Sequence, residues 1–313
     1  MQDAVITTGM RRLPGGVFTM GSADFYPEER PVRRVRVDSF WIDEAPVTNR
    51  EFAAFVEATG HTTFAQIAPD PAHYPGMAPE MAQPGSLVFE GAAAPVDLSD
   101  PSQWWRFAIG ADWRHPTGPQ SSLAGLEDHP VVHVAYADAR AYAAWAGKAL
   151  PTEAEWEYAA WGGLKGASYA WGDELAPGGA MLANYWQGEF PVTNRLEDGW
   201  ERTSPVRAFP PNGFGLFDMI GNVWEWTTDW FEAPSRAPGQ VASPCCGAPA
   251  AAKLGRKVLK GGSHLCAPNY CQRYRPAARY PQPLDTTTSH VGFRCVLRRS
   301  AGRGVARDLM QRR

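Results

Sequence analysis

The sequence has 313 residues and a net charge of −3, with 44% apolar and 20% charged residues. This balance is typical of a globular protein and indicates neither a nucleic-acid-binding surface nor an acidic tail. No stretch approaches the roughly 18 consecutive apolar residues of a membrane span. The N-terminus also lacks the pattern of a secretory signal. We therefore expect a cytoplasmic protein that binds neither nucleic acid nor membrane.

Glycine and proline are abundant, with 31 and 28 copies, and the chain also holds 13 tryptophans. Many turns and loops are therefore expected, with large aromatic rings filling the core between them. We find no internal repeat and no linker. The sequence predicts one α+β domain with little regular secondary structure over residues 1–297. The arginine-rich residues 298–313 are predicted to form a flexible tail rather than a nucleic-acid-binding arm.

The first predicted elements are a strand and a capped helix. Residues 33–43 alternate in part between polar and apolar side chains and predict a strand. Thr48 and Glu51 have the spacing of a capping box, apolar residues follow at helical spacing, and Gly60 ends the predicted helix. Residues 66–103 are rich in proline and show no sustained period, which predicts a long irregular excursion.

Two more helices are predicted further along the chain. The apolar residues 130–134 first predict a short buried strand. A helix is then expected from about residue 137 to 146. Another is expected to begin at Thr152, again with a glutamate three residues later as in a capping box, and to direct Trp156 inward. Beyond residue 162, short aromatic-rich pieces alternate with turns.

Cys266 and Cys271 stand five positions apart, with Pro268 and Asn269 between them to turn the chain. Such a turn could bring both sulfurs to one point. Two thiolates suit a soft ion of low coordination number, and Cu(I) is the soft first-row choice. Zinc prefers four ligands, and no second cysteine or histidine cluster completes such a set. The spacing alone is also compatible with a local disulfide or with two unrelated core thiols.

The seven histidines offer no comparable cluster. His129 and His133 are four residues apart, but the intervening residues favour a strand, so the two rings need not share a face. His264 lies two residues before Cys266, which leaves its role open. A structural role is the simpler interpretation for the others. No H-x-D/E fragment of an iron-binding facial triad occurs.

Two patches combine carboxylate and amide side chains with turn carbonyls, the oxygen ligands that calcium takes. One joins Asn184 and Tyr185 to the later residues 198–200, and the other runs over residues 218–225. Neither resembles an EF-hand loop. Solvated acidic loops are the alternative interpretation.

Together these segments resemble the formylglycine-generating enzyme (sulfatase-modifying factor) family from Leu13 to about Val296. The matching stretches are LPGGVFTMGS (13–22), PVTNREFAAFV (46–56), HPVVHV (129–134), LPTEAEWEYAA (150–160), NYWQGEFPVTN (184–194), PNGFGLFDMIGNVWEWTTDW (211–230), KGGSHLCAPNYCQRYRPAAR (260–279) and GFRC (292–295). Most of them mark the fold. The cysteine pair in the pattern GGS-x-x-C-x4-C-x-RYR is the specific part, and it is intact.

The resemblance implies a C-type-lectin-like α+β fold and a copper-dependent aerobic oxidase. Family members hold Cu(I) between two thiolates, here Cys266 and Cys271. They convert the cysteine of a C-x-P-x-R motif, in an unfolded segment of a client sulfatase, to formylglycine. The client cysteine binds as a further thiolate, O2 is activated at copper, a hydrogen leaves the β-carbon, and the resulting thioaldehyde is hydrolysed. A thiol reductant is also expected.

The resemblance also assigns further site residues. Trp224 and Ser263 match residues that line the family's oxygen pocket, and Tyr270 and Arg273 match positions beside the site. Two structural calcium ions are implied as well. Their ligands carry over to Asn184, the Tyr185 carbonyl, Asp198 and the Trp200 carbonyl in one site, and to Asp218, the Gly221 and Val223 carbonyls and Glu225 in the other.

The sequence departs from the family at several positions. His290 stands where relatives commonly have an asparagine near the substrate, which leaves the client preference open. Asp218 replaces an asparagine, which adds charge and should not weaken calcium binding. Cys295 matches a cysteine that is bridged in secreted relatives, but Ala160 stands at the partner position. Pro276 replaces another bridging cysteine, and both changes agree with a reducing compartment.

Two other functions are compatible with such a scaffold. A non-haem iron oxygenase of the sulfoxide-synthase kind would need an iron-binding histidine set, usually with a helical partner domain, and the sequence shows neither. A non-catalytic binding module on the lectin-like scaffold would not need Cys266 and Cys271. The sequence assigns no role to Cys245 and Cys246.

Overall fold

The computed structural model describes residues 7–232 and 255–298. Cys245, Cys246 and the predicted tail beyond residue 298 lie outside these residues. The helices are α2 (Asn49–Thr59), α3 (Tyr136–Trp145) and α4 (Glu153–Ala160), with short 3-10 turns η1 (Pro27–Glu29), η2 (Phe64–Gln66), η3 (Pro71–His73), η4 (Pro79–Met81), η5 (Pro101–Gln103) and η6 (Pro177–Gly179). The strands are β1 (Met10–Leu13), β2 (Gly16–Met20), β3 (Arg33–Val37), β4 (Phe40–Asp43), β5 (Gly85–Phe89), β6 (Trp105–Ile109), β7 (Trp224–Trp230), β8 (Arg256–Lys260), β9 (Arg279–Pro283), β10 (Val291–Gly292) and β11 (Val296–Leu297).

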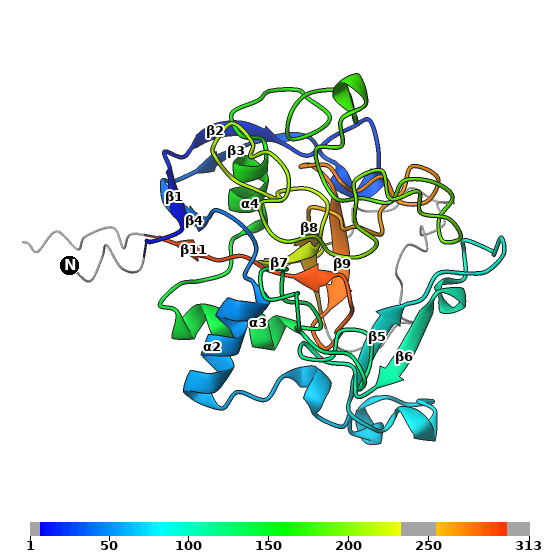
Figure 1. Ribbon diagram of the computed structural model, residues 1–313. Helices are drawn as coiled ribbons and strands as arrows, with labels where there is room; N and C mark the ends of the chain where they lie inside the picture. The colour runs from blue at the N-terminus through cyan, green and yellow to red at the C-terminus, as the bar shows by residue number, and fades with distance from the viewer. Residues whose placement is uncertain (1–6, 233–254, 299–313) are drawn as a thin grey trace, which may run out of the picture.

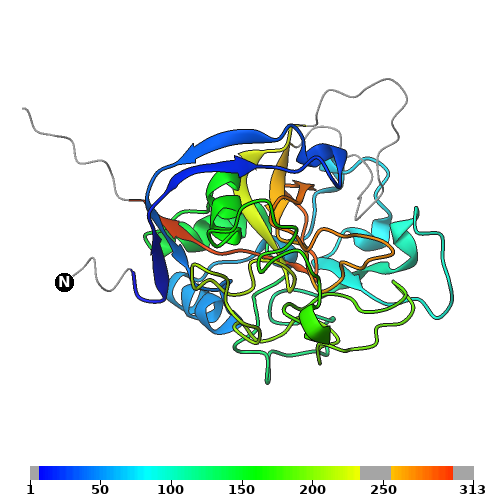
Figure 2. The same cartoon turned by 90° about the horizontal axis from the view of Figure 1, so that it is seen from above.

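The strands form several small sheets (Figure 1). One sheet has the order β10-β7-β8-β9, with β10 parallel to β7 and the other pairs antiparallel. Another has the order β1-β4-β11, so strands from both ends of the described chain share one sheet. β2–β3 and β5–β6 are two-stranded ribbons, and the first of them packs over α4 (Figure 2). The predicted α+β domain with little regular structure is confirmed. Within the described residues, no helix is long and apolar enough to cross a membrane.

The helix predictions are confirmed. Thr48 and Thr152 cap α2 and α4, and each side chain accepts a hydrogen bond from the backbone N–H of the glutamate three residues later. Gly60 follows α2 in the left-handed region, with φ 67°. Trp156 on α4 is fully buried, as predicted. α3 begins at Tyr136, one residue before the predicted start.

Two strand predictions need correction. Residues 33–43 form two strands, β3 and β4, which pair with different partners. Residues 130–134 are buried as predicted but do not form a strand. Pro130 makes only an isolated bridge, and His133 has φ 59° and donates its backbone N–H to the Thr288 carbonyl. The backbone N–H groups of Val131 and His133 donate to two different segments, at Val47 and Thr288, and not to one partner strand. The apolar run predicted burial correctly but could not indicate how the backbone is paired.

The proline-rich excursion holds a strand that the sequence analysis missed. β5 lies inside residues 66–103 and pairs with β6 in antiparallel register from Gly85 with Ile109 to Phe89 with Trp105. Five residues are too few for alternation to stand out against a background of prolines. The ribbon matters for the site, because Phe89 and the half-buried Trp105 belong to one aromatic cluster with Leu265 and Ala267, which flank Cys266.

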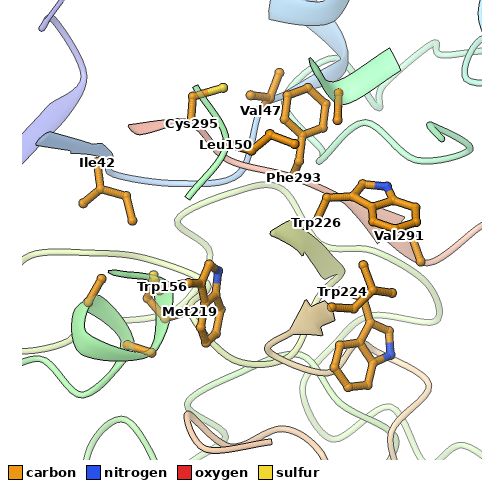
Figure 3. Packing of buried hydrophobic residues seen from close by; sticks show 14 of the residues in the cluster. Ile42, Val47, Leu150, Trp156, Met219, Trp224, Trp226, Val291, Phe293 and Cys295 are labelled. Carbon is orange, nitrogen blue, oxygen red and sulfur yellow. The ribbon is translucent and has the colours of Figure 1, made fainter. Parts of the chain in front are cut away.

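Large aromatic side chains fill the core, as the tryptophan content predicts. Figure 3 shows Trp156, Trp224 and Trp226 among aliphatic residues from distant segments, and each is at most 1% exposed. Trp226 donates its indole N–H to the Val134 carbonyl at 3.0 Å, which satisfies its polar group inside the core. A few short elements therefore enclose one large core.

A fully buried ion pair links the four-stranded sheet to the three-stranded sheet. Nε and Nη2 of Arg294 donate to the Glu225 carboxylate at 2.8–3.0 Å, and neither residue is exposed. Trp156 donates its indole N–H to the same carboxylate at 2.8 Å. Arg294 also donates to the backbone carbonyls of Asp43, Glu44, Phe217 and Asp218.

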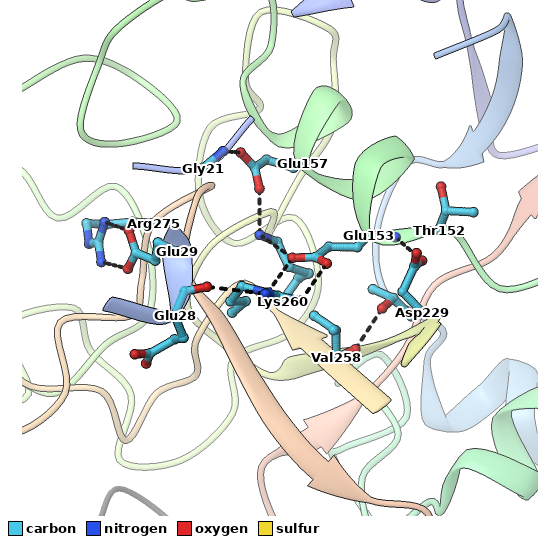
Figure 4. Close-up of polar contacts among 12 residues, drawn as sticks. Gly21, Glu28, Glu29, Thr152, Glu153, Glu157, Asp229, Val258, Lys260 and Arg275 are labelled. Carbon is cyan, nitrogen blue, oxygen red and sulfur yellow. Dashed lines mark hydrogen bonds and ion pairs between the residues drawn. The ribbon is translucent and has the colours of Figure 1, made fainter. Parts of the chain in front are cut away.

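A second polar network joins α4 to β8, β9 and η1 (Figure 4). Buried Lys260 pairs with Glu157 at 2.8 Å, and Glu157 also accepts from the Gly21 N–H at 2.7 Å. The network also holds the ion pairs Lys260–Glu153 at 3.9 Å, Arg279–Glu153 at 2.8 Å and Arg275–Glu29 at 3.0 Å. This network fixes η1 beside the segment that follows the cysteine pair.

We expect Arg294→Met to lower the free energy of unfolding by about 3–5 kcal/mol, because it leaves the Glu225 carboxylate buried without its cation. Urea unfolding measures the change. Arg50→Met is the matched control, since the side chains of the Arg50–Asp128 pair are 63% and 67% exposed. That variant should leave stability nearly unchanged. Equal effects of the two substitutions would contradict the importance given to the buried pair.

Candidate active site

Cys266 and Cys271 face each other across a short turn. The Cys271 N–H donates to the Ala267 carbonyl at 2.8 Å, and the Cys266 N–H donates to the Ser263 carbonyl at 2.9 Å. Both cysteines are at most 2% exposed. Their sulfurs are 3.2 Å apart, well beyond the roughly 2.0 Å of a disulfide bond. The predicted turn is confirmed, and it holds two adjacent thiols instead of a local disulfide.

Backbone hydrogen bonds hold this turn against the loops that carry the two candidate calcium patches. The Trp186 N–H donates to the Cys266 carbonyl at 3.0 Å, and the His264 N–H donates to the Asn222 carbonyl at 3.0 Å. The Asn222 N–H in turn donates to the Asn184 carbonyl at 2.8 Å. The position of the cysteine pair therefore depends on both loops.

A small apolar cavity lies beside the two sulfurs. Its walls include Trp224 and Ser263, which the sequence analysis placed at an oxygen pocket, as well as the predicted neighbours Tyr270 and His290. Ring stacking shapes the wall, since Tyr270 lies parallel to Phe190 at 4.5 Å between centroids. The other lining residues are Trp104, Trp105, Leu265 and the two cysteines.

The parallel pairing of β10 with β7 brings Trp224 and His290 together. The Trp224 N–H donates to the His290 carbonyl at 2.9 Å. The His290 ring lies 4.8 Å from the Trp105 ring, and its Nδ1 is 2.7 Å from the Thr288 hydroxyl oxygen. Burial lowers the pKa of His290 to about 3, so its ring is neutral near pH 7. His290 therefore adds no charge to the cavity.

His264 has a structural contact rather than one with the sulfurs. Its Nδ1 is 2.8 Å from the Asn222 carbonyl oxygen, so this nitrogen carries a proton and donates. Burial lowers the pKa of His264 to about 4. Over residues 7–232 and 255–298, no group of three or more His, Cys, Asp or Glu side chains is arranged to hold a metal ion. The iron-binding histidine set that an oxygenase would need is not among the described residues.

Arg273 contacts the cysteine pair without lining the cavity. Its Nη1 is 3.8 Å from the Cys271 sulfur, and its Nη2 forms an ion pair with Glu28. The guanidinium lies over the Tyr26 ring, 3.8 Å from the centroid. Glu28 and Tyr26 stand far earlier in the chain, and no local pattern in the sequence connected them with the site.

In the first candidate calcium patch, the Gln187 side-chain amide donates to two of the predicted ligands, the Tyr185 carbonyl and Asp198. Asp198 accepts from the backbone N–H groups of Tyr185 at 3.2 Å and Trp200 at 2.9 Å. The side chain of Asn184 donates to the Arg202 carbonyl at 2.8 Å, while its Oδ1 is buried with no hydrogen-bond partner among the described residues. A buried amide oxygen without a hydrogen bond is an acceptor that a hard cation could use.

The second candidate patch has its charges partly satisfied by the protein itself. Both Glu225 oxygens accept from Arg294, so a cation would have to share this carboxylate. Asp218 has φ 53° and accepts from the Arg207 N–H at 2.8 Å. Burial raises the pKa of Asp218 to about 6, and the negative charge of Glu225 adds to the shift. A cation here would relieve the cost of ionising Asp218.

Most of the aromatic wall of the cavity could not be predicted from the sequence. Trp104 and Trp105 directly follow the stretch 66–103 that showed no period, and Phe190 lies in an aperiodic segment as well. The available signal was the presence of several large rings in segments with no predicted element to bury them. Such rings need a surface to pack against, and here they pack against one another around the two sulfurs.

Solved structures share this architecture at low sequence identity. PvdO from Pseudomonas aeruginosa superposes with a TM-score of 0.60 and 24% identity, over 93% of this chain and 94% of that one. CarF superposes with a TM-score of 0.52 and 19% identity, over 93% and 98% of the two chains. At these identities the likeness establishes a common fold and nothing about activity.

Residues 1–299 match the family model described as the sulfatase-modifying factor enzyme 1-like domain, and the chain belongs to this family. It is 57% identical to the formylglycine-generating enzyme of Mycobacterium tuberculosis, over 91% of this chain and 96% of that protein. The corresponding enzyme of Streptomyces coelicolor is 50% identical, over 93% and 89%. A protein of Bos taurus named inactive C-alpha-formylglycine-generating enzyme 2 is 39% identical, over 93% and 88%. Family membership alone therefore does not decide activity.

We expect Asp218→Asn to change how stability depends on pH. The pKa of Asp218 is about 6 in the folded protein, against an ordinary aspartate value of 3.8, so the protonated carboxyl favours the fold. This contribution is complete below pH 3.8 and is lost as the pH rises through 6. Without calcium, the unfolding free energy of the natural protein minus that of the variant should fall by up to about 3 kcal/mol between about pH 4 and 7. Urea unfolding measures it, and a constant difference would contradict the shift.

Proposed function

We propose that the protein converts a cysteine of a client sulfatase to formylglycine, using Cu(I), O2 and a thiol reductant. Its family and the names of its bacterial relatives support this proposal. The observation that carries it is the pair of thiol sulfurs 3.2 Å apart beside an aromatic cavity. One client thiol, one O2 and two reductant thiols would give one aldehyde, one hydrogen sulfide, one water and one disulfide.

The donor set on the turn fits Cu(I). Cys266 and Cys271 supply two soft ligands, while the neutral rings of His264 and His290 hold hydrogen bonds to other groups. Such a pair suits a soft ion of low coordination number better than zinc, which prefers four ligands. When bound, copper would supply the activation of O2 that the oxidation needs.

The protein's own groups would prepare the cavity for this reaction. The rings of Trp104, Trp224 and Tyr270 line it with apolar surface, which would disfavour bulk water there. The Ser263 hydroxyl oxygen accepts from the Leu265 N–H at 3.2 Å, which leaves the hydroxyl proton available to an acceptor in the cavity. An uncharged wall of this kind strengthens the few polar contacts that a reactant can make inside it.

The client would have to be flexible near its cysteine. The two sulfurs are buried beside a small cavity, so only an extended segment can bring a side chain to them. The motif C-x-P-x-R, implied by the family resemblance, is proposed as that segment. A cytoplasmic location is proposed as well, since a reducing compartment keeps both thiols of the pair available.

The reaction can be tested with a C-x-P-x-R peptide, the copper-loaded protein, a thiol reductant and air. We expect the peptide to lose its thiol and gain an aldehyde, detected by mass spectrometry and an aldehyde-reactive probe. A peptide with serine for cysteine should not react, because a hydroxyl oxygen is too hard a ligand for Cu(I). Conversion of that peptide, or conversion without O2, would contradict the mechanism.

Matched variants separate the cysteine pair from the fold. Cys266→Ser and Cys271→Ser should stay folded and lose copper and activity together. Cys295→Ser is the control, because Cys295 is also buried but does not line the cavity, and it should keep both properties. Full copper occupancy after both site cysteines are replaced would contradict the copper site. No conversion despite bound copper would favour a non-catalytic binding module.

We also propose that calcium at the two patches stabilises the fold without taking part in the reaction. Calcium removal by exhaustive chelation should lower the melting temperature, since a ligand at about 100 times its Kd contributes about 2.7 kcal/mol. Asp198→Ala should remove the part of this effect that belongs to the first patch. Asp97→Asn, which alters an exposed acid elsewhere, should respond to chelation like the natural protein. An unchanged melting curve after verified calcium removal would count against both ions.

A further inference from the structure

A short N-terminal segment contacts the residues that follow Cys271. Residues 25–29, named here the 25–29 clamp, comprise Phe25, Tyr26 and η1. The Tyr26 hydroxyl accepts from the Gln272 N–H at 3.0 Å. The Arg275 guanidinium lies 3.5 Å from the centroid of the Phe25 ring and pairs with Glu29. The clamp therefore holds residues on both sides of Arg273.

One side chain of the clamp reaches the cysteine pair through a single arginine. Glu28 forms an ion pair with Nη2 of Arg273, and Nη1 of the same guanidinium is 3.8 Å from the Cys271 sulfur. The Arg273 side chain is 2% exposed and that of Glu28 is 18% exposed. Because the guanidinium is planar and rigid, fixing Nη2 and stacking the plane on Tyr26 also fixes where Nη1 points.

We propose that Glu28 is a positioning residue for the cysteine pair, holding the guanidinium of Arg273 against the Cys271 sulfur. The inference rests on the copper site proposed above. Two thiolates around one monovalent cation leave a net negative charge in a buried, apolar place, which is costly without a nearby positive charge. Arg273 supplies that charge. The negative charge of Glu28 is closer to solvent and is screened more strongly than the positive charge of Arg273. It therefore does not cancel the stabilisation that Arg273 gives to the negative charge at the sulfurs.

The rest of the clamp does not depend on the Glu28 carboxylate. Figure 4 shows that carboxylate turned away from the Lys260 network, while Glu29 pairs with Arg275. Glu28 contributes to the network only through its backbone carbonyl, which accepts from Arg279 at 3.2 Å. A change of the Glu28 side chain therefore removes its contact with Arg273 and leaves the other contacts of η1 in place.

The test measures Cu(I) affinity of the purified protein, without oxygen, by competition with bicinchoninate. Glu28→Ala should raise the Kd for Cu(I) about tenfold, as expected for the loss of one charge-assisted contact. Glu28→Gln, which keeps a neutral acceptor, should fall between it and the natural protein. Asp24→Asn removes an exposed acid from the same loop and is the control with unchanged Kd. The copper-free melting temperature is recorded alongside: both Glu28 variants should lower it, because the buried Arg273 loses its counter-ion, and Asp24→Asn should leave it unchanged.

A double-mutant cycle separates positioning from a general structural effect. In an Arg273→Ala background, or Arg273→Met if that variant does not fold, Glu28→Ala should have little further effect on the Kd, because neither side chain can pair with Glu28. Additive effects would overturn the proposed route through Arg273. An unchanged Kd in Glu28→Ala, with copper bound by the natural protein, would overturn this inference alone. Absence of copper binding by the natural protein would overturn the copper proposal and this inference with it.

Discussion

The fold depends on one buried cation and the acceptors it requires. A guanidinium without water must donate to protein groups, and Arg294 finds the Glu225 carboxylate and four backbone carbonyls. These acceptors come from the end of β4, from the loop before β7 and from β7 itself. Trp224 directly precedes Glu225 on β7 and lines the cavity. The Arg294–Glu225 pair therefore also fixes the position of this part of the cavity wall. The contacts of Arg294 therefore hold β4, β7 and the loop before β7 together in a chain that has few regular elements.

The sequence predicted those parts of the structure in which the interacting residues lie only a few positions apart in the chain. A capping threonine acts three residues away, so α2 and α4 could be predicted. The turn between Cys266 and Cys271 is equally local, and it brings the sulfurs together as expected. The family resemblance identified Trp224, Ser263, Tyr270 and His290, which all line the cavity. No spacing rule would have grouped these four.

What the sequence could not predict depends on contacts between distant segments. Trp104 and Trp105 gain their role only when β5 and β6 pair beside the cysteine turn. Glu28 contacts Arg273 across most of the chain. Glu225 is a second example of a contact that the sequence could not predict. Its carboxylate lies in an oxygen-rich patch and therefore suggested a metal ligand, but in the structure it pairs with Arg294. Residue type indicates which contacts are possible, and only the fold determines which partner is taken.

The short turn at the cysteine pair has an entropic consequence. When two ligands come from distant segments, the chain loses conformational entropy as it brings them together, and this loss is complete only when the whole chain folds. Here five positions separate the sulfurs, and the Cys271 N–H bond to the Ala267 carbonyl already closes that interval. An incoming ion would not have to close a loop, so its binding and release need little rearrangement of the surrounding fold. If the proposed ion binds there, its loss and replacement would leave the cavity walls in place.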